Sequence, residues 1–196
     1  MKKISLVCSL FALMAFVGCK DEKKDMNVME SEIDTVQTET EKPAQPSSTI
    51  SVSMEPKSNS TARGEVYFSE TNGTVTLEAK FSGLTPGTHA IHLHEKADCS
   101  AEDATSAGGH WNPTMAPHGK WGDAAGYHKG DIGNFEVSAD GSGQVTMQTD
   151  EWCIGCGDEK KDILGKAVIV HEGADDFKTQ PTGDAGGRLA CGGIIK

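Results

Sequence analysis

The sequence is poor in basic and in aromatic residues. It has 18 lysines and arginines against 29 aspartates and glutamates, a net charge of -11, and only 6% aromatic residues. Because binding to nucleic acid requires a basic surface that neutralises phosphates, this balance excludes a nucleic acid as partner. Helical periodicity of useful length is also missing, whereas glycine is abundant at 23 residues. Frequent glycines indicate frequent turns, and therefore short strands rather than long helices.

The sequence also lacks an apolar run long enough to span a bilayer comfortably. The run at residues 4–17 follows Lys2 and Lys3 and is shorter than the roughly 20 residues that a membrane-spanning helix needs. A positive start followed by a short apolar stretch predicts a secretory signal peptide over residues 1–18. A short membrane anchor is the alternative.

The end of this leader, Phe16-Val17-Gly18-Cys19, resembles a lipobox, the cleavage site of bacterial lipoproteins, with Phe16 where leucine is usual. The resemblance implies an exported protein anchored by a lipid on Cys19 to the bacterial cell envelope, at the periplasmic face or the cell surface. An ordinary signal peptide with a chance cysteine is the alternative. Residues 19–48 have few large apolar side chains and no periodicity, which predicts a disordered tether between the lipid and a folded domain.

From Thr49 onward, short alternating apolar runs are separated by turn signals such as Asn72-Gly73 and Asp140-Gly141. The pattern predicts about eight strands, and therefore an all-β domain over residues 49–196. We expect an immunoglobulin-like β-sandwich or an eight-stranded Greek-key barrel. Two long intervals, residues 96–130 and 172–188, have little strand character. Loops of this length in a compact domain are usually functional.

The histidines are concentrated where metal binding would need them. His92 and His94 are two residues apart on a predicted strand, so both rings share one face. His171 directly follows the apolar run at residues 167–170. The first long loop holds three imidazoles and a carboxylate, a set that suits tetrahedral zinc: His110, His118, His128 and Asp131. Scattered solvent-exposed histidines are the alternative.

Five stretches carry a family resemblance, in the order in which that family has them. They are GTHAIHLHE at 87–95, SAGGHWNP at 106–113, HKGDIGN at 128–134, VHE at 170–172 and GDAGGRLACG at 183–192. On these residues the chain from about Thr49 to Lys196 resembles copper/zinc superoxide dismutase. The resemblance implies dismutation of superoxide to oxygen and hydrogen peroxide by a redox-cycling copper beside a structural zinc, protecting the cell envelope.

The resemblance also implies a role for each matching residue. His110 would bridge the two metals, leave copper on reduction and carry a proton. Arg188 would lie beside the copper channel, His89 would support the copper strand from behind, and Asp175 would link a copper ligand to a zinc ligand. Copper would be held by His92, His94, His110 and His171, and zinc by His110, His118, His128 and Asp131.

The predicted β domain contains four cysteines. The resemblance implies a disulfide between Cys99 and Cys191. The segment 152–157 adds Cys153 and Cys156, whose CxxC spacing is found in redox motifs, in half of a metal site and in local disulfides. Because no βαβ pattern surrounds it, we favour a local Cys153–Cys156 disulfide.

Two other functions stay open at this point. A non-catalytic envelope lipoprotein that binds copper and zinc would need the same ligands but not Arg188. A structural adhesin domain could use the same scaffold, since a fold does not fix a function. The sequence also leaves open whether the protein is a monomer or a homodimer.

Overall fold

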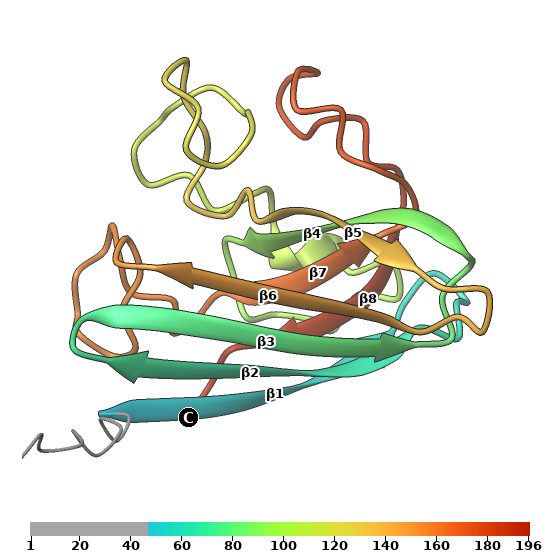
Figure 1. The fold of residues 1–196 in the computed structure, drawn as a ribbon, viewed down its shortest axis with the longest axis horizontal. Helices are drawn as coiled ribbons and strands as arrows, with labels where there is room; N and C mark the ends of the chain where they lie inside the picture. The colour runs from blue at the N-terminus through green and yellow to red at the C-terminus, as the bar shows by residue number, and fades with distance from the viewer. Residues whose placement is uncertain (1–46) are drawn as a thin grey trace, which may run out of the picture. The chain divides into compact units, whose positions relative to one another are not determined.

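The computed structural model describes residues 47–196, which form a closed antiparallel β-barrel (Figure 1). The predicted signal peptide at 1–18, Cys19 and nearly all of the predicted tether at 19–48 lie outside the described residues. Within 47–196 no helix has the length and apolar character needed to cross a membrane. The strands are β1 (Ser48–Pro56), β2 (Arg63–Thr71), β3 (Thr74–Ser82), β4 (Gly87–His94), β5 (Gly133–Val137), β6 (Gly143–Thr149), β7 (Ala167–His171) and β8 (Arg188–Gly193).

The first three strands show how the alternating pattern becomes structure. In β1, Val52 and Met54 are buried while Ser51 and Ser53 are exposed, as a strand with one face on a core requires. Asn72 (φ 52°) and Gly73 (φ 77°) form the two-residue turn between β2 and β3. Both residues have positive φ, which is the geometry that an Asn-Gly hairpin favours. The prediction of an eight-stranded all-β fold is confirmed.

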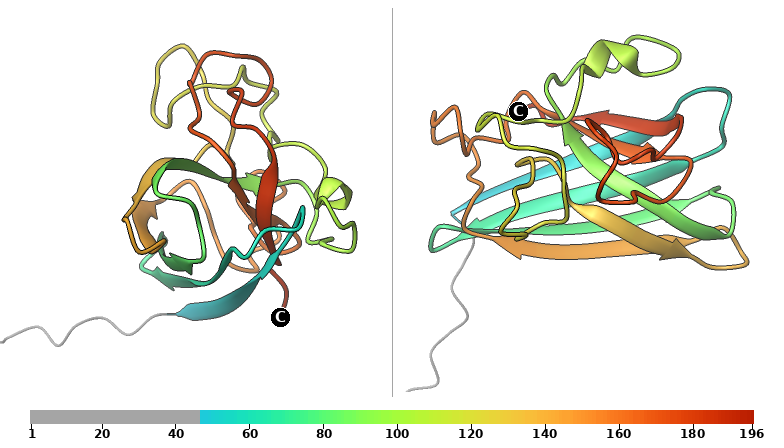
Figure 2. Two further views of the ribbon diagram at one scale, coloured as in Figure 1. Left: turned by 90° about the vertical axis from the view of Figure 1, so that its right-hand side faces the viewer. Right: turned by 90° about the horizontal axis from the view of Figure 1, so that it is seen from above.

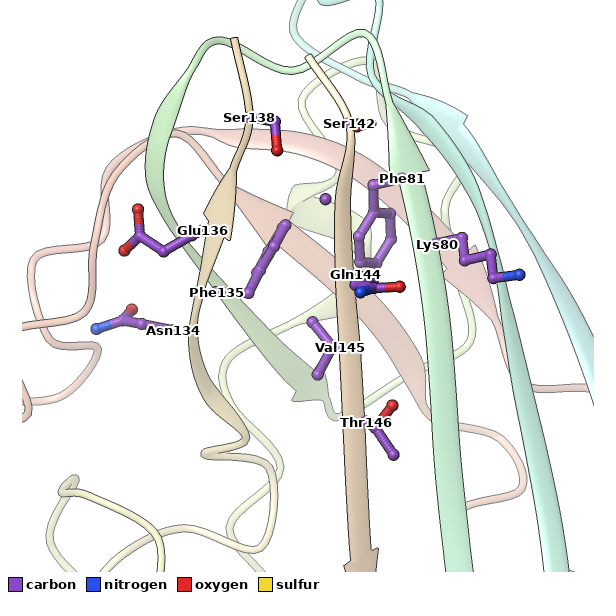
Figure 3. A pocket seen from close by; sticks show the side chains of 11 residues that line it. Lys80, Phe81, Asn134, Phe135, Glu136, Ser138, Ser142, Gln144, Val145 and Thr146 are labelled. Carbon is purple, nitrogen blue, oxygen red and sulfur yellow. The ribbon is translucent and has the colours of Figure 1, made fainter. Parts of the chain in front are cut away.

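The strand order around the barrel is β1-β2-β3-β6-β5-β4-β7-β8, so the chain crosses from β3 to β4 before β5 and β6 fill the space between them. This is Greek-key connectivity. Two seams of the barrel are narrow. β1 meets β8 at two residue pairs, and β5 meets β6 only where Val137 faces Gly143. Beyond that pair β5 and β6 diverge and leave a depression lined by Phe81 and Phe135, without any histidine (Figure 3).

The inside of the barrel holds the main core, and a smaller apolar cluster lies on its outer face. Ile169 and Cys191, on β7 and β8, pack there against Ala104 and Ala107 from the loop with the 3-10 helix η1 (Thr105–Ala107). A disulfide joins Cys99 of this loop to Cys191 of β8, the pairing that the family resemblance implies. The loop therefore covers β7, all five residues of which are buried.

The remaining part of the first long loop and the whole of the second lie on the same side of the barrel. Residues 111–132 and 172–187 rise next to each other beyond β4 and β7, in yellow and red-orange (Figures 1 and 2). The sequence predicted both segments as long loops without strands, and the structure agrees. Their shared position brings the loop histidines to the histidines of β4 and β7.

Candidate metal centre

His92 and His94 project from the outer face of β4. The residues between and before them, Leu93 and Ile91, point into the main core, so strand alternation turns both imidazoles outward. Both histidines are nevertheless fully buried, at 0% exposure, because the two long loops cover them. Burial of an HxH pair under loops gives the rings fixed positions.

His110 reaches the same place because its loop continues the sheet beside β4. It forms an isolated antiparallel bridge with His94, and the Trp111 N–H donates to the Leu93 carbonyl at 2.8 Å. The Leu93 N–H in turn donates to the Gly130 carbonyl at 2.9 Å. A Cβ at position 130 would lie 2.2 Å from the Leu93 oxygen, so this close approach requires glycine.

His171 comes from the end of β7, beside β4. Its ring shares the outer side with Ile169, whereas Val168 and Val170 face the core. His89 approaches from the opposite, core-facing side of β4, and its Nδ1 lies 2.8 Å from the His171 main-chain carbonyl. His89 therefore fixes the backbone of His171, in the supporting position that the resemblance implies.

These side chains converge into two groups that share one residue. In each group the potential ligand atoms all lie within 4.8 Å of one another, and every member is buried. His110 belongs to both, and its ring centroid is 4.0 Å from that of His92. The first group is His92, His94, His110 and His171, and the second is His110, His118, His128 and Asp131.

The hydrogen bonds of the first group leave its inward nitrogens free for a metal. His94 Nδ1 donates to the Gly108 carbonyl (2.9 Å) and His171 Nδ1 contacts the Gly186 carbonyl (3.3 Å), so neutral rings keep their lone pairs on Nε2. These two Nε2 atoms face each other at 3.3 Å. His92 Nδ1 and His110 Nε2 are buried without a hydrogen-bond partner. Such orphaned acceptors are costly unless a cation satisfies them.

The second group shows the same signature around Asp131. His118 Nδ1 and His128 Nδ1 lie 3.0 and 3.2 Å from its carboxylate oxygens, yet neither contact has hydrogen-bond geometry. His110 Nδ1 lies 2.9 Å from Oδ1 of the same carboxylate. Three imidazole nitrogens and one carboxylate therefore converge on a common point, which is the donor set of a tetrahedral metal site. The residues fit a metal in both groups.

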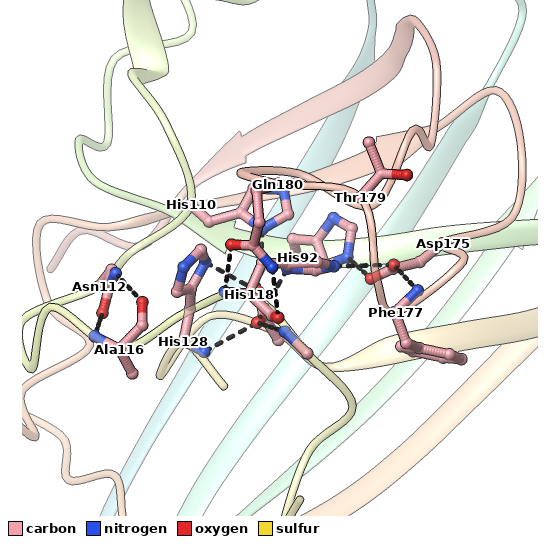
Figure 4. A network of polar contacts seen from close by, with 12 residues as sticks. His92, His110, Asn112, Ala116, His118, His128, Asp175, Phe177, Thr179 and Gln180 are labelled. Atoms are coloured by element: carbon pink, nitrogen blue, oxygen red, sulfur yellow. Dashed lines mark hydrogen bonds and ion pairs between the residues drawn. The ribbon is translucent and has the colours of Figure 1, made fainter. Parts of the chain in front are cut away.

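Asp175 ties the two groups together from outside (Figure 4). Its Oδ2 lies 2.9 Å from His92 Nε2 and its Oδ1 lies 2.9 Å from His118 Nε2. Gly183 makes room for this arrangement. It has φ 69°, and a Cβ there would lie 1.9 Å from Asp175 Oδ1. Hydrogen bonds of this kind fix the orientation of ligand rings and raise their basicity.

Burial and charge set the protonation of the rings. Burial lowers the pKa of His94 and His171 well below the usual value, and it lowers the pKa of His110 to about 4. These imidazoles are therefore neutral at pH 7, the form that binds metals. Burial acts on His118 in the same direction, but hydrogen bonds to Asp131 and Asp175 outweigh it and raise the pKa of His118 to about 9. The carboxylates of Asp131 and Asp175 therefore stabilise a positive charge at His118.

Three amide side chains hold the loops, and the sequence predicts a role for none of them. Gln180 accepts from the His118 N–H (2.8 Å) and donates to the His118 carbonyl (2.9 Å). Asn134 pairs with the main chain of Asp175 in the same two-bond manner, and Asn112 with that of Ala116. Isolated Asn and Gln residues in loops carry no sequence signal for such pairing.

The segment before Cys153 also braces the loop of the second group. Trp152 is 1% exposed, and its Nε1–H donates to the Lys129 carbonyl at 2.9 Å. Glu151 pairs with Lys129 and accepts a hydrogen bond from the Tyr127 hydroxyl at 2.6 Å. These contacts flank His128 on both sides, so they fix the backbone that carries it.

Arg188 lies at the edge of the first group. It opens β8 opposite His171, and its guanidinium donates to the carbonyls of Ala104 (2.7 Å) and Gly108 (2.8 Å). The side chain is half-buried, and burial lowers its pKa, while Asp103 acts in the opposite sense. A guanidinium stays charged at any ordinary pH. Arg188 therefore presents a fixed positive charge beside the histidines.

The family model of copper/zinc superoxide dismutase (SODC) matches residues 62–194. The chain belongs to the copper/zinc superoxide dismutase family. β1, which pairs with β2 and closes the barrel against β8, precedes the matched segment.

Two curated relatives show the range within the copper/zinc superoxide dismutase family. The chain is 37% identical over 135 residues to the superoxide dismutase-like protein YojM of Bacillus subtilis, covering 67% of each chain. It is 36% identical over 137 residues to the extracellular superoxide dismutase [Cu-Zn] of Caenorhabditis elegans, covering 67% of this chain and 60% of that one. The chain thus spans well under the full length of both relatives.

Two solved structures have a similar fold. A crystal structure of a SOD-like protein from Bacillus subtilis aligns with a TM-score of 0.66 at 33% identity, covering 74% of this chain and 97% of that one. The clock protein EA4 aligns with a TM-score of 0.65, also at 33% identity, covering 76% and 96%. These likenesses confirm the expected barrel.

Proposed function

We propose that this protein dismutates superoxide, with copper in the group of His92, His94, His110 and His171 and zinc in the group of His110, His118, His128 and Asp131. The observation that carries the proposal is the position of His110, whose two ring nitrogens face different metal groups. When bound, copper would supply one-electron redox chemistry, and zinc would supply a fixed charge that does not change its redox state.

The residues around the first group support both halves of the proposed dismutation, the oxidation of one superoxide to oxygen and the reduction of another to hydrogen peroxide. His110 Nε2 is buried and has no hydrogen-bond partner, and burial lowers the pKa of the ring to about 4. A proton taken up at this nitrogen would therefore be released readily to a reduced oxygen species. The Asp131 carboxylate beside Nδ1 fixes the orientation of the ring. Arg188 attracts an anion to a protein whose net charge is -11. Its two carbonyl contacts hold that charge in place without neutralising it.

The rival proposal is a metal store without turnover. A store needs donor atoms, and it gains nothing from a guanidinium that two carbonyls fix next to the first metal group. That placement favours catalysis over storage. The family itself includes proteins described only as superoxide dismutase-like, so activity has to be measured rather than inferred from membership.

The test is metal analysis together with a dismutation assay on the chain without its predicted leader. The proposal predicts one copper and one zinc per chain and rapid dismutation. His171→Ala should lose copper and its activity, by at least about a hundredfold, whereas the exposed-residue control Lys178→Ala should keep both. A protein that binds both metals but turns over no faster in the parent chain than in His171→Ala would be a store.

We also propose that the protein is exported and anchored to the cell envelope by a lipid on Cys19. Support comes from the sequence of the leader and its lipobox-like end. Fractionation of cells expressing the parent chain and Cys19→Ala tests this point. The parent should be found with membranes and incorporate labelled fatty acid. Cys19→Ala should incorporate none, and equal labelling of both would contradict the anchor.

A further inference from the structure

The loop at residues 150–166 carries a second disulfide, between Cys153 and Cys156, that the proposed function does not use. The two cysteines differ sharply in accessibility. Cys153 is buried, at 6% exposure, beside Trp152 and Ile154, whereas Cys156 is exposed. A reagent in solution can therefore reach this disulfide only from the Cys156 side.

The loop keeps its shape through contacts other than the disulfide. The Cys153 N–H donates to the Lys161 carbonyl at 2.8 Å, and the Ile163 N–H donates to the Cys153 carbonyl at 3.1 Å. The Asp162 carboxylate accepts main-chain N–H bonds at 2.9, 2.9 and 3.0 Å from Gly155, Gly157 and Leu164. Opening the disulfide would leave this framework in place, so both oxidation states fit the same fold.

The disulfide also contributes little as a structural crosslink. Its cysteines are 3 residues apart, against 92 for Cys99 and Cys191. Because a crosslink restricts the unfolded chain less when it closes a shorter loop, Cys153–Cys156 stabilises the fold less. The Asp158 N–H, in addition, points at Cys156 Sγ at 3.5 Å. A donor at this place would stabilise a thiolate on Cys156.

We propose that Cys153–Cys156 is a thiol–disulfide exchange site, open to thiols in solution and separate from the metal centre. An incoming thiolate attacks Cys156 Sγ, the bond to Cys153 Sγ breaks, and Cys153 leaves as a thiolate that takes up a proton. A second thiolate then attacks the sulfur of the first thiol in the mixed disulfide. This step releases the oxidised thiol pair and leaves Cys156 as a thiolate, which takes up a second proton from the solvent. The protein has then gained two electrons from the thiols and two protons from the solvent.

The other disulfide of the described residues, Cys99–Cys191, provides an internal reference. Cys191 is 1% exposed on β8 and lies under the η1 loop, packed with Ala104 and Ala107. Its partner Cys99 is partly buried against the same cluster, whereas Cys156 is exposed, so a thiol in solution has less access to Cys99–Cys191 than to Cys153–Cys156. The structure therefore predicts an order of opening, with Cys153–Cys156 first and Cys99–Cys191 only at much higher thiol concentration.

The experiment is a titration of the metal-loaded protein with reduced glutathione, quenched with an alkylating agent and read by peptide mass spectrometry. The proposal predicts alkylation of Cys153 and Cys156 at glutathione concentrations at least about tenfold below those that open Cys99–Cys191, with a glutathione adduct on Cys156 during the reaction. Opening of both disulfides over the same range would overturn the proposal, as would an adduct on Cys153 alone.

Two single variants test which sulfur reacts. Cys153→Ser leaves the exposed Cys156 as a free thiol, and Cys156→Ser leaves the buried Cys153. With oxidised glutathione, the Cys153→Ser protein should form its mixed disulfide at least about tenfold faster than the Cys156→Ser protein. Equal rates in two folded variants would contradict the proposal. If either variant does not fold, the titration of the parent protein still decides the order of opening.

Discussion

His94 and Arg188 share one hydrogen-bond acceptor, the carbonyl oxygen of Gly108. His94 Nδ1 lies 2.9 Å from it and Arg188 Nη2 lies 2.8 Å from it. One main-chain carbonyl thereby sets the tautomer of a proposed copper ligand and the position of the only nearby fixed cation that the proposed mechanism uses. Because Gly108 belongs to the loop that the Cys99–Cys191 disulfide ties to β8, this local geometry depends on the barrel itself.

Substitution of Arg188 should separate catalysis from metal binding. Arg188→Gln removes the charge, and we expect kcat/KM to fall about tenfold, with a weaker dependence on salt, because attraction of the anion is lost. The kcat/KM of Arg188→Lys should lie between those of the parent and Arg188→Gln, since lysine keeps the charge but cannot donate to two carbonyls at once. Metal content should stay at the parent level in both. An unchanged salt dependence in Arg188→Gln would count against the role.

Asp175 should control the affinity of the second group for zinc. Asp175→Asn removes the carboxylate that orients His92 and His118, and loss of such a partner typically lowers metal affinity 10- to 100-fold. Competition with a chelator measures the change. The control is Glu172→Gln, which alters an exposed carboxylate of the same loop and should leave zinc affinity at the parent value. Equal affinities in all three proteins would show that the link is dispensable.

Gln180 should act through the backbone of His118 and not through the metal. Gln180→Ala removes both amide bonds to that backbone, and we expect zinc to dissociate several-fold faster, with a loss of about 1–2 kcal/mol in stability of the metal-free domain. Thermal unfolding and stopped-flow chelation measure the two effects. Thr179→Ala is the neighbouring control. If Gln180→Ala releases zinc at the same rate as this control, the hydrogen bonds of Gln180 to the His118 backbone do not help to retain zinc.

The metal-free domain should lose stability as the pH falls from about 6.5 toward 4. His110 has its pKa lowered to about 4 in the folded state, so below pH 6.5 the unfolded chain binds the proton first and unfolding becomes favoured. His110 alone would lower the free energy of unfolding by about 2–3 kcal/mol between pH 7 and pH 4.5. Burial also lowers the pKa of His94 and His171, so these residues add to the loss.

His118 affects the pH dependence of stability in the opposite direction. Its pKa is raised to about 9, so its contribution is fully present below pH 6.5 and is lost as the pH rises through 9. Stability of the metal-free domain should therefore reach a maximum between these limits. Urea unfolding at pH 4.5, 7 and 9.5 measures the profile. A metal-free domain that is most stable at pH 4.5 would contradict the assignment of neutral, buried histidines.

The fold was largely predictable because its strands are short, alternating and separated by clear turn signals. The Asn72-Gly73 turn and the alternation of Val52 and Met54 in β1 were both visible in the sequence. The narrow β5–β6 seam was not, since β5 and β6 each have an ordinary alternating pattern and only the three-dimensional closure of the barrel sets how far they pair. Whether the strands form a barrel or a sandwich could likewise not be predicted, because it depends on how the sheet closes in three dimensions.

The candidate site was predictable in its members but not in its supports. The ligand histidines stand out because imidazoles are rare and clustered, and because His92 and His94 have strand spacing. The brace formed by Glu151 and Trp152 against Tyr127 and Lys129 could not be predicted, because it joins two loops through ordinary side chains. Which ring nitrogen remains free is also set by distant carbonyls such as that of Gly108, which no local pattern encodes.

A crystal structure of the protein loaded with copper and zinc, with anomalous data at both metal edges, tests the central claim most directly. The account predicts one copper among His92, His94 and His171 and one zinc among His118, His128 and Asp131. Opposite nitrogens of the His110 ring should contact the two ions, each at about 2.0–2.1 Å. Two ions without His110 between them, or a single ion taking one group while the other stays empty, would contradict it.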